Sequence, residues 1–278
     1  MSARWESKDR ALVDGPTPRV MGIVNVTPDS FSDGGRWADR DAAVAHGKLL
    51  AIEGAEILDV GGESTRPGSD VVPADEEIRR VVPVVERLAP LGIPISIDTM
   101  KPEVARAALA AGACIVNDVS GLRDERMAEV AAEFGAAVVV MHMQGNPQTM
   151  QDDPRYDDVV GEVFDYLAER IRWCESRGIP RARIAIDPGI GFGKTFEHNM
   201  DLLRGLDRFA TLDCAVVIGI SRKGLLKKIT GKGMALRLTA SVVSSLAACT
   251  LGARVARVHD VGPMVDAIKV WGAIRGWE

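Results

Sequence analysis

The chain has 278 residues, of which 46% are hydrophobic and 26% charged, enough to bury the core of one domain of the size of an α/β barrel. Its net charge of −5 and its pI near 5.5 argue against a protein that binds nucleic acid or a membrane surface by bulk positive charge. No apolar run approaches the ~20 residues of a membrane-spanning helix, and the four scattered cysteines form no CxxC pair that would indicate a zinc site.

Residues 1–18 come first and are polar, without the apolar core of a secretory signal. We interpret them as a polar tail, of the kind that is often disordered, before a single domain at 19–278. The scattered cysteines are typical of buried thiols in a reducing compartment. The chain is therefore expected to be cytoplasmic.

From residue 19 onward, short apolar runs alternate with stretches whose apolar residues recur at helical spacing. The apolar runs predict strands at 20–25, 57–60, 93–97, 114–117, 137–141, 184–186, 215–219 and 255–258. Helices are expected at 40–53, 75–88, 102–110, 125–133, 158–176, 196–206, 236–251 and 263–276. Continuous apolar strands favour a parallel sheet covered by helices. Eight such units in succession predict a (β/α)8 TIM barrel, and the pattern alone leaves a doubly wound open sheet as the alternative.

Polar side chains gather where the predicted strands end, whereas the turns that enter the strands carry glycine and small apolar residues. Barrel enzymes build their active sites from the loops at the carboxyl ends of the strands. The polar positions are Asn25, 62–68, Asp98, Asn117, His142, Asp187, 221–223 and 257–260. They predict an active site at that end of the barrel.

Four of these residues suit the edge of a planar heterocycle. The carboxylates of Asp98 and Asp187 can accept a guanidine-like pair of N–H groups, and Lys223 can donate to a carbonyl or ring nitrogen. Asn117 belongs to the same group, because an amide can both donate and accept.

A second group suits a phosphate or pyrophosphate. Arg66, Arg257 and His259 can form charge-assisted hydrogen bonds, and the amides of the helix that follows Val261 can add the favourable end of a helix dipole. Each residue also has a simpler interpretation, since a strand-end aspartate is often a helix cap and His259 alone could be structural. The occurrence of the whole set at successive strand ends favours the functional interpretation.

Residues 22–35, GIVNVTPDSFSDGG, closely resemble the first signature of the dihydropteroate synthase family, and residues 59–68, DVGGESTRPG, resemble the second. The family order continues with SIDT at 96–99, VND at 116–118, DPGIGFGK at 187–194, SRK at 221–223 and RVHDV at 257–261. The resemblance implies a barrel enzyme that joins 6-hydroxymethyl-7,8-dihydropterin pyrophosphate to p-aminobenzoate in folate biosynthesis. It also implies SN1-like loss of pyrophosphate, followed by attack of the amine.

The resemblance implies a binding site for each substrate. The implied pterin pocket comprises Asp98, Asn117, Met141, Asp187, Gly219 and Lys223. The pyrophosphate contacts are Arg66, Arg257 and His259, and the p-aminobenzoate contacts are Thr65, Pro67, Phe192, Ser221 and Lys223. Asn25 is the implied ligand of a Mg²⁺ ion that accompanies the pyrophosphate. The implied catalytic residues are Asp98, Lys223, Arg66, Arg257 and His259.

Two other functions are weighed against this one. A pterin-dependent methyltransferase would share the barrel and the pterin contacts, but it would not need the motifs at 65–67 and 221–223. A non-catalytic pterin-binding paralogue would be expected to lose those motifs, which are whole here. The resemblance further implies a homodimer formed through the outer helices, small-molecule partners that include sulfonamides, and neither nucleic acid nor a membrane as a partner.

The chain departs from the family pattern in two places. Gly224 and Leu225 stand where the family commonly has a bulky residue and an aromatic, and 227–240 lacks an expected Gly-Thr pair. The rim of the amine pocket and the packing of the helix after the seventh strand are therefore expected to differ.

Overall fold

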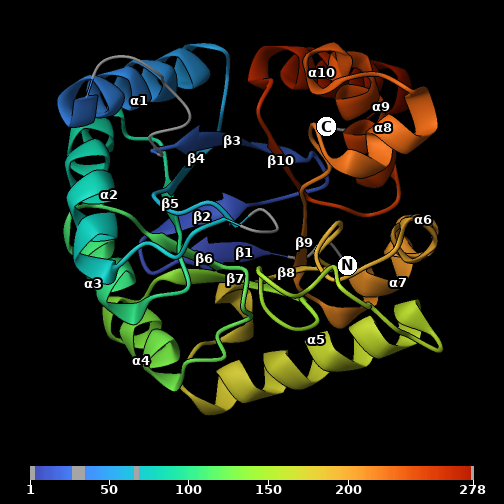
Figure 1. Ribbon diagram of the computed structural model, residues 1–278, viewed down its shortest axis with the longest axis horizontal. Helices are drawn as coiled ribbons and strands as arrows, with labels where there is room; N and C mark the ends of the chain where they lie inside the picture. Colours follow the sequence, from blue (N-terminus) through green and yellow to red (C-terminus); the bar gives the residue numbers. More distant parts are fainter. Residues whose placement is uncertain (1–3, 27–34, 66–68, 277–278) are drawn as a thin grey trace.

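The computed structural model describes residues 4–26, 35–65 and 69–276. Within them eight parallel strands close into a barrel in the order β10-β3-β4-β5-β6-β7-β8-β9 (Figure 1). The strands are β3 (Arg19–Asn25), β4 (Ile57–Gly61), β5 (Ile95–Asp98), β6 (Ile115–Asp118), β7 (Ala137–Met141), β8 (Ile184–Asp187), β9 (Ala215–Ile218) and β10 (Val255–Val258). Because β10 pairs with both β9 and β3, the barrel prediction is confirmed and the open sheet is excluded.

Helices surround the barrel and cover its outer face (Figure 1). They are α1 (Gly35–Ile52), α2 (Ala74–Leu88), α3 (Pro102–Ala110), α4 (Glu125–Phe134), α5 (Val159–Ser176), α6 (Phe196–Arg204), α7 (Leu206–Phe209), α8 (Gly224–Thr230), α9 (Leu238–Thr250) and α10 (Val261–Arg275). The predicted helices are present with ends shifted by a few residues, whereas α8 was not predicted and Gly205 divides the expected 196–206 helix. No helix in the described ranges combines the length and apolar character needed to cross a membrane.

Side chains alternate between the interior of the barrel and the helices, as the two-residue period of a strand requires. Leu58 and Val60 of β4 belong to the core between strands and helices, whereas Ile57 belongs to a separate cluster inside the barrel. Polar residues then stand two positions beyond apolar interior residues: Asp59 after Ile57, Asn117 after Ile115, Asp187 after Ala185 and Arg257 after Val255. This phase carries the polar residues inward at the carboxyl end of the barrel.

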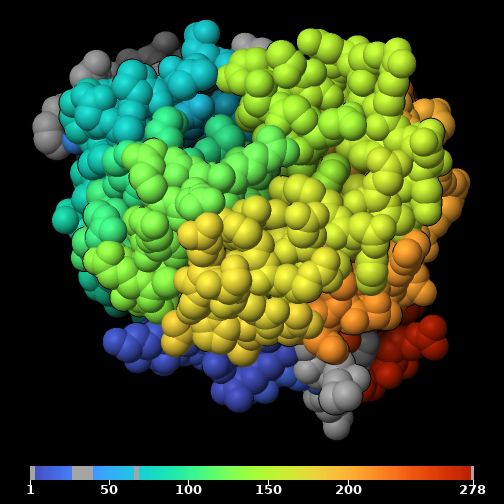
Figure 2. Space-filling model, turned by 90° about the horizontal axis from the view of Figure 1, so that it is seen from below, coloured from blue at the N-terminus to red at the C-terminus, as the bar shows by residue number. Residues whose placement is uncertain are grey.

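The interpretation of residues 1–18 as a polar tail is wrong for the described part. Strands β1 (Trp5–Ser7) and β2 (Arg10–Val13) pair as an antiparallel hairpin, shown in blue at the lower end of the molecule in Figure 2. Trp5 is fully buried in the interior cluster together with Leu12 and Val13, and its Nε1 donates to the carbonyl of Arg183 at 3.2 Å. Burial of these apolar groups fixes the segment across the amino-terminal end of the barrel.

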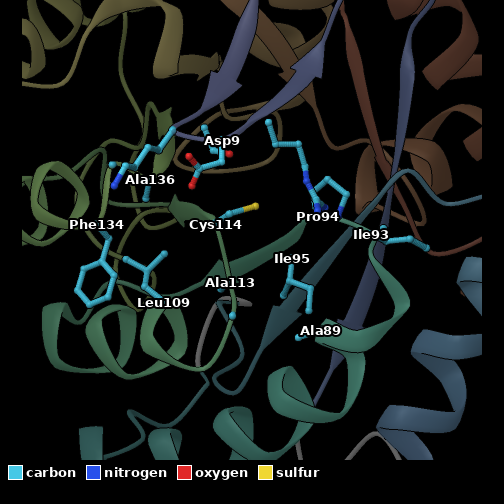
Figure 3. Close-up of a pocket in the computed structure, with 15 residues that line it drawn as sticks. Asp9, Ala89, Ile93, Pro94, Ile95, Leu109, Ala113, Cys114, Phe134 and Ala136 are labelled. Carbon is cyan, nitrogen blue, oxygen red and sulfur yellow. The ribbon is translucent and has the colours of Figure 1, made fainter.

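A small cavity of about 280 Å³ remains beside this hairpin. Figure 3 shows Asp9 on the hairpin side and Ile95 and Cys114 on the barrel side, with Leu109 and Phe134 from helices α3 and α4. The strands enter the barrel here, which is the end opposite to the polar strand termini. This cavity is therefore separate from the predicted active site.

Candidate functional site

A cavity of about 880 Å³ opens at the carboxyl ends of the strands. The predicted site residues that line it are Asn25, Thr65, Asp98, Phe192, Gly219, Ser221, Lys223, Arg257 and His259. Asn117, Met141 and Asp187 do not line it, although each is buried at the end of its strand. Arg66 and Pro67 lie outside the described residues.

Arg257 links two carboxylates at the base of this cavity. Its Nε donates to Oδ2 of Asp59 at 2.6 Å, and its Nη2 donates to Oδ2 of Asp98 at 2.6 Å. Asn117 donates from Nδ2 to the same Asp59 oxygen at 3.1 Å. Asp59 is fully buried, so it fixes both an arginine and an amide that the sequence predicts to bind substrate.

Asp98 keeps one oxygen free for a ligand. Its Oδ1 is buried and has no hydrogen-bond partner within the described part of the chain. Burial raises the pKa of Asp98 to about 7, against the lowering effect of Arg257, and the charge of Asp59 raises it further. A buried oxygen without a partner is costly, and an N–H donor of a ligand would satisfy it.

Asp187 and Lys223 form a second polar pair on the other side of the site. Oδ1 of Asp187 accepts from the amide of Gly189 at 2.7 Å, and burial raises the pKa of this carboxyl while Lys223 opposes the shift. Burial lowers the pKa of Lys223 to about 8. Nζ of Lys223 donates to the carbonyl of Ile190 and lies 4.7 Å from the ring centre of Phe192.

An apolar wall accompanies these polar groups. Met141 and Met143 pack with Val119 and Met150 in one cluster, and Phe192 contacts it. Methionine is flexible and packs well against aromatic rings. The wall therefore suits the face of a flat heterocycle whose edge meets carboxylates.

The turn after β9 carries Ser221, Arg222 and Lys223 in a constrained geometry. Arg222 has φ +60°, a left-handed conformation that is uncommon outside glycine. Ser221 contacts His259 of the next loop, with 3.0 Å between its Oγ and the Nδ1 of His259. Arg237 stabilises the turn, because its Nη1 donates to the carbonyl of Arg222 at 2.9 Å and to the carbonyl of Lys223 at 3.3 Å.

The loop after β4, which carries Thr65, is held by buried charges. Lys101 bridges Glu63 of this loop and Glu77 of α2, with 2.6 Å between Nζ and Oε2 of Glu77. Nη1 of Arg80 donates to the carbonyl of Gly62 at 3.0 Å. These contacts fix the base of the loop immediately before Thr65.

The described residues offer few ligands for a metal ion. The described residues contain no group of three or more His, Cys, Asp or Glu side chains that could hold one. Asn25 ends β3 and faces the cavity, and its amide oxygen is a hard ligand suited to Mg²⁺. A Mg²⁺ ion held by one amide oxygen would need further oxygens from a substrate and water, as is usual for this ion.

The backbone amides at the start of α10 were expected to bind phosphate, and for one of them this expectation is wrong. The N–H of Gly262 donates to Oε2 of Glu53 at 3.2 Å, so this donor already has a carboxylate partner. Arg222 pairs with Asp260 at the same helix start, with Nε 3.0 Å from Oδ2. The anion contacts predicted at Arg257 and His259 remain at the cavity wall.

Sequence reasoning assigned no role to Asp59, Lys194 or Arg237. Asp59 could have been found, because it stands in phase with Ile57 on the interior face of β4. Lys194 lies in a quoted motif, but its local sequence does not show that it is buried. Arg237 lies in the segment that departs from the family pattern, and no local signal points to its contacts.

The closed barrel with a polar cavity at its carboxyl end defines an α/β-barrel enzyme. Residues 21–259 match the pterin binding enzyme family, and the chain belongs to this family. It is 47% identical to the dihydropteroate synthase of Escherichia coli K12 over 91% of this chain and 90% of the relative. The resemblance inferred from the motifs is confirmed.

Solved structures agree with this assignment. Dihydropteroate synthase of Xanthomonas albilineans with 4-aminobenzoic acid has a TM-score of 0.92 and 50% identity, and the match covers 99% of each chain. The same enzyme in complex with 7,8-dihydropteroate has a TM-score of 0.89 and 47% identity, over 98% of each chain.

Proposed function

We propose that the protein is a dihydropteroate synthase, a transferase that condenses 6-hydroxymethyl-7,8-dihydropterin pyrophosphate with p-aminobenzoate to give 7,8-dihydropteroate and pyrophosphate. The observation that carries the proposal is the pairing of Arg257 with Asp98 in the cavity wall, because it places a cation beside a carboxylate whose second oxygen is free for a ligand. The relatives with 4-aminobenzoic acid and 7,8-dihydropteroate bound support the choice of substrates.

The pterin is proposed to bind with its edge toward the carboxylates. Asp98 and Asp187 accept N–H groups of the ring, and Asn117 and Lys223 supply the donors that complete the edge. Asn117, Met141 and Asp187 are buried beyond the described cavity wall, so the ring must enter more deeply than the cavity as it stands. Gly219 lies beside Lys223 and Arg257, where an added Cβ would make an ordinary contact at 3.8 Å from Nζ of Lys223.

The pyrophosphate is proposed to leave toward Arg257 and His259. Arg66, which lies outside the described residues, is proposed as a further cation. Positive groups stabilise the charge that develops on a departing phosphate. Asn25 would hold Mg²⁺ at the same end of the cavity, and the ion would supply charge neutralisation of the pyrophosphate oxygens.

The amine is proposed to bind on the side of Thr65, Phe192, Ser221 and Lys223. Pro67, which lies outside the described residues, is proposed as a further contact of the amine. Loss of pyrophosphate leaves a cation on the pterin methylene, which the carboxylate of Asp98 stabilises. The amine then attacks this carbon and loses a proton to solvent. The reaction needs no protein nucleophile, so the residues act by position and charge.

The decisive experiment is a coupled assay of pyrophosphate release with Mg²⁺ and both substrates. We expect release only when the pterin pyrophosphate and p-aminobenzoate are both present, together with formation of 7,8-dihydropteroate. Lys223→Ala and Asp187→Asn should each cripple turnover. Tight pterin binding without release would favour a non-catalytic paralogue, and methyl transfer from a methylated pterin would favour a methyltransferase.

The Mg²⁺ requirement is tested in the same assay. Chelation should suppress pyrophosphate release, and added Mg²⁺ should restore it. Asn25→Ala should raise the Mg²⁺ concentration needed for half-maximal rate. An unchanged Mg²⁺ dependence in this variant would contradict the role of Asn25. A sulfonamide is proposed to compete with p-aminobenzoate, which inhibition kinetics against that substrate will test.

A homodimer is proposed through helices α8, α9 and α10, which lie side by side (Figure 1). We define an apolar helical patch by the exposed residues of these helices, Ile229, Leu238, Val243, Val270 and Ile274, together with Met234 and Leu236 of the 3-10 helix between α8 and α9. A cluster of exposed apolar residues of this extent is typical of a protein interface. Light scattering should give the mass of a dimer for the wild type and of a monomer for Val243→Lys, whereas Val71→Lys, outside the patch, should leave the mass unchanged.

A cytoplasmic location is proposed from the thiols. Cys114, Cys174, Cys214 and Cys249 are all free, and the last three are buried. Free thiols are typical of proteins in a reducing compartment. Cell fractionation checks this location.

A further inference from the structure

Lys194 is a charged residue with only 3% of its surface exposed, at the end of the glycine-rich loop after β8. It borders the substrate cavity, but the family resemblance as stated from the motifs gives it no role. Burying an amine is costly unless the amine is paired. Its contacts therefore show what it does.

The amine of Lys194 meets three acceptors. Nζ lies 3.0 Å from Nδ1 of His142, 2.9 Å from the carbonyl of Phe192 and 3.3 Å from the carbonyl of His142. Burial lowers the pKa of His142 to about 2, so the ring is neutral and Nδ1 can accept. A protonated lysine has three N–H donors, and these contacts match the charged form.

These contacts join the loop after β7 to the loop after β8. The two backbones touch at Gly189, which has φ +71° and where a Cβ would lie 1.9 Å from the carbonyl oxygen of His142. The amide of Gly189 donates to Asp187 at 2.7 Å. Lys194 thus fixes the turn that orients Asp187, and it holds the backbone of Phe192 in the cavity wall.

Lys194 also acts on Asp187 through charge. After Lys223, the amide of Gly189 and Arg257, it is a further group that lowers the pKa of this buried carboxyl. Burial lowers the pKa of Lys194 itself to about 7, while Asp187 raises it. Tyr156 and Tyr166 contact the ring of His142, and Arg123 acts on the pKa of that ring.

We propose that Lys194 is a positioning residue for pterin binding. It ties the Asp187 turn to the His142 loop and places a second lysine cation near the carboxylate of Asp187. The inference rests on the proposed function for the identity of the ligand, the pterin that Asp187 binds. Lys194 acts through Asp187 and Phe192. Lys194 is therefore added to the residues that shape the proposed pterin pocket.

The test is calorimetric binding of 6-hydroxymethyl-7,8-dihydropterin pyrophosphate with Mg²⁺ and without p-aminobenzoate, on both sides of pH 7. Lys194→Met should weaken binding roughly tenfold, equivalent to about 1.4 kcal/mol. The loss of affinity on acidification should also move to higher pH, because Asp187 without the cation takes up a proton more readily. The KM for p-aminobenzoate should change less than that for the pterin.

Further variants separate charge from structure. Lys194→Arg keeps its charge at all working pH values, so it should retain the wild-type acid limb and extend tight binding to more alkaline pH. Lys194→Gln keeps an N–H donor without the charge, so it should shift the acid limb of the binding profile as Lys194→Met does. It also replaces the methionine variant as the test if that variant does not fold. Lys48→Met, an exposed residue of α1, removes the same charge and should match the wild type.

The outcomes are distinguishable. Lys194 variants that bind the pterin with wild-type affinity and pH dependence, while melting at lower temperature, would reduce the residue to a structural role and overturn the inference. A wild type that binds the pterin pyrophosphate but releases no pyrophosphate with p-aminobenzoate would overturn the proposed function and leave the inference standing. A wild type that does not bind this ligand overturns both.

Discussion

Arg257 on β10 donates from Nη2 to Oδ2 of Asp98 on β5 at 2.6 Å, across 159 positions of sequence. The two side chains meet because their strands both end at the open side of the barrel. Asp59 holds the same guanidinium from β4. The cavity therefore contains one arginine between two carboxylates, and the protonation of Asp98 depends on both neighbours.

Activity is expected to rise with pH as Asp98 ionises. Burial raises the pKa of this carboxyl to about 7, and the carboxylate form is the one that stabilises the pterin cation. Below this pKa the acid is protonated and the rate falls. On the alkaline side the rate falls again as Lys194 and Lys223, with pKa values lowered by burial to about 7 and about 8, lose their charge. A pH profile of kcat/KM for the pterin pyrophosphate measures this. Asp98→Asn should lower the rate by roughly 10²–10³ and should abolish the fall in kcat/KM at acid pH. If that fall persisted in the variant, the titration would belong to another group.

Asp59→Asn is expected to lower both the stability and the pKa of Asp98. Removing one partner of a buried ion pair costs about 3 kcal/mol or more, and Asp59 is fully buried against Arg257. The charge of Asp59 raises the pKa of Asp98, so the acid limb of the rate profile should move to lower pH.

Urea unfolding and the same pH profile measure both effects of the Asp59 variant. Glu133→Gln is the matched control, because its pair with Arg106 is half exposed and should contribute little to stability. An Asp59 variant as stable as this control would show that the pair does not hold the barrel interior.

The barrel and the inward phase of its strands could be predicted from the sequence, since Ile57, Ile115 and Val255 fix the register of the polar residues that follow them. Asp98 could be placed at a strand end by the same reasoning. The hydrogen bond between Asp98 and Arg257 could not be predicted from the sequence. A contact across the barrel depends on how the sheet closes and on the direction of the side chains, and local sequence patterns contain neither.

The amino-terminal hairpin and the Gly262 amide show a second limit. Trp5 stands in a polar segment, and only the open amino-terminal end of the barrel gives it a place to be buried. The start of α10 looks like a phosphate site by its helix geometry, but Glu53 from α1's following turn binds its amide. In both cases a distant part of the chain decides the local outcome.

Trp5→Ala is expected to destabilise the protein by about 3–5 kcal/mol, as for other large buried aromatics, because Trp5 is fully buried at the base of the barrel. The rate at temperatures where the variant is folded should be unchanged, since the hairpin lies at the end opposite to the substrate cavity. Thermal melting and kcat/KM measure the two effects. Ile52→Ala, at a position 83% exposed, is the control. If the Trp5 variant had the same melting temperature as this control, the hairpin would not be part of the core.

Arg237→Ala is expected to loosen the turn of Lys223. The arginine is only 8% exposed, and its Nη1 and Nε hold the carbonyls of Arg222 and Lys232 at 2.9 and 3.1 Å. Loss of these donors removes two part-buried hydrogen bonds, at about 0.5–1.5 kcal/mol each. It also frees a backbone that holds a left-handed residue at position 222.

Steady-state kinetics of the Arg237 variant should show a roughly tenfold higher KM for p-aminobenzoate, equivalent to about 1.4 kcal/mol of binding. The reason is that Ser221 and Lys223 of this turn line the proposed amine side of the cavity. Arg172→Ala, an exposed residue of α5, should leave the KM unchanged. A variant that loses stability but keeps its KM would show that Arg237 supports the fold of α8 and α9 without shaping the amine site.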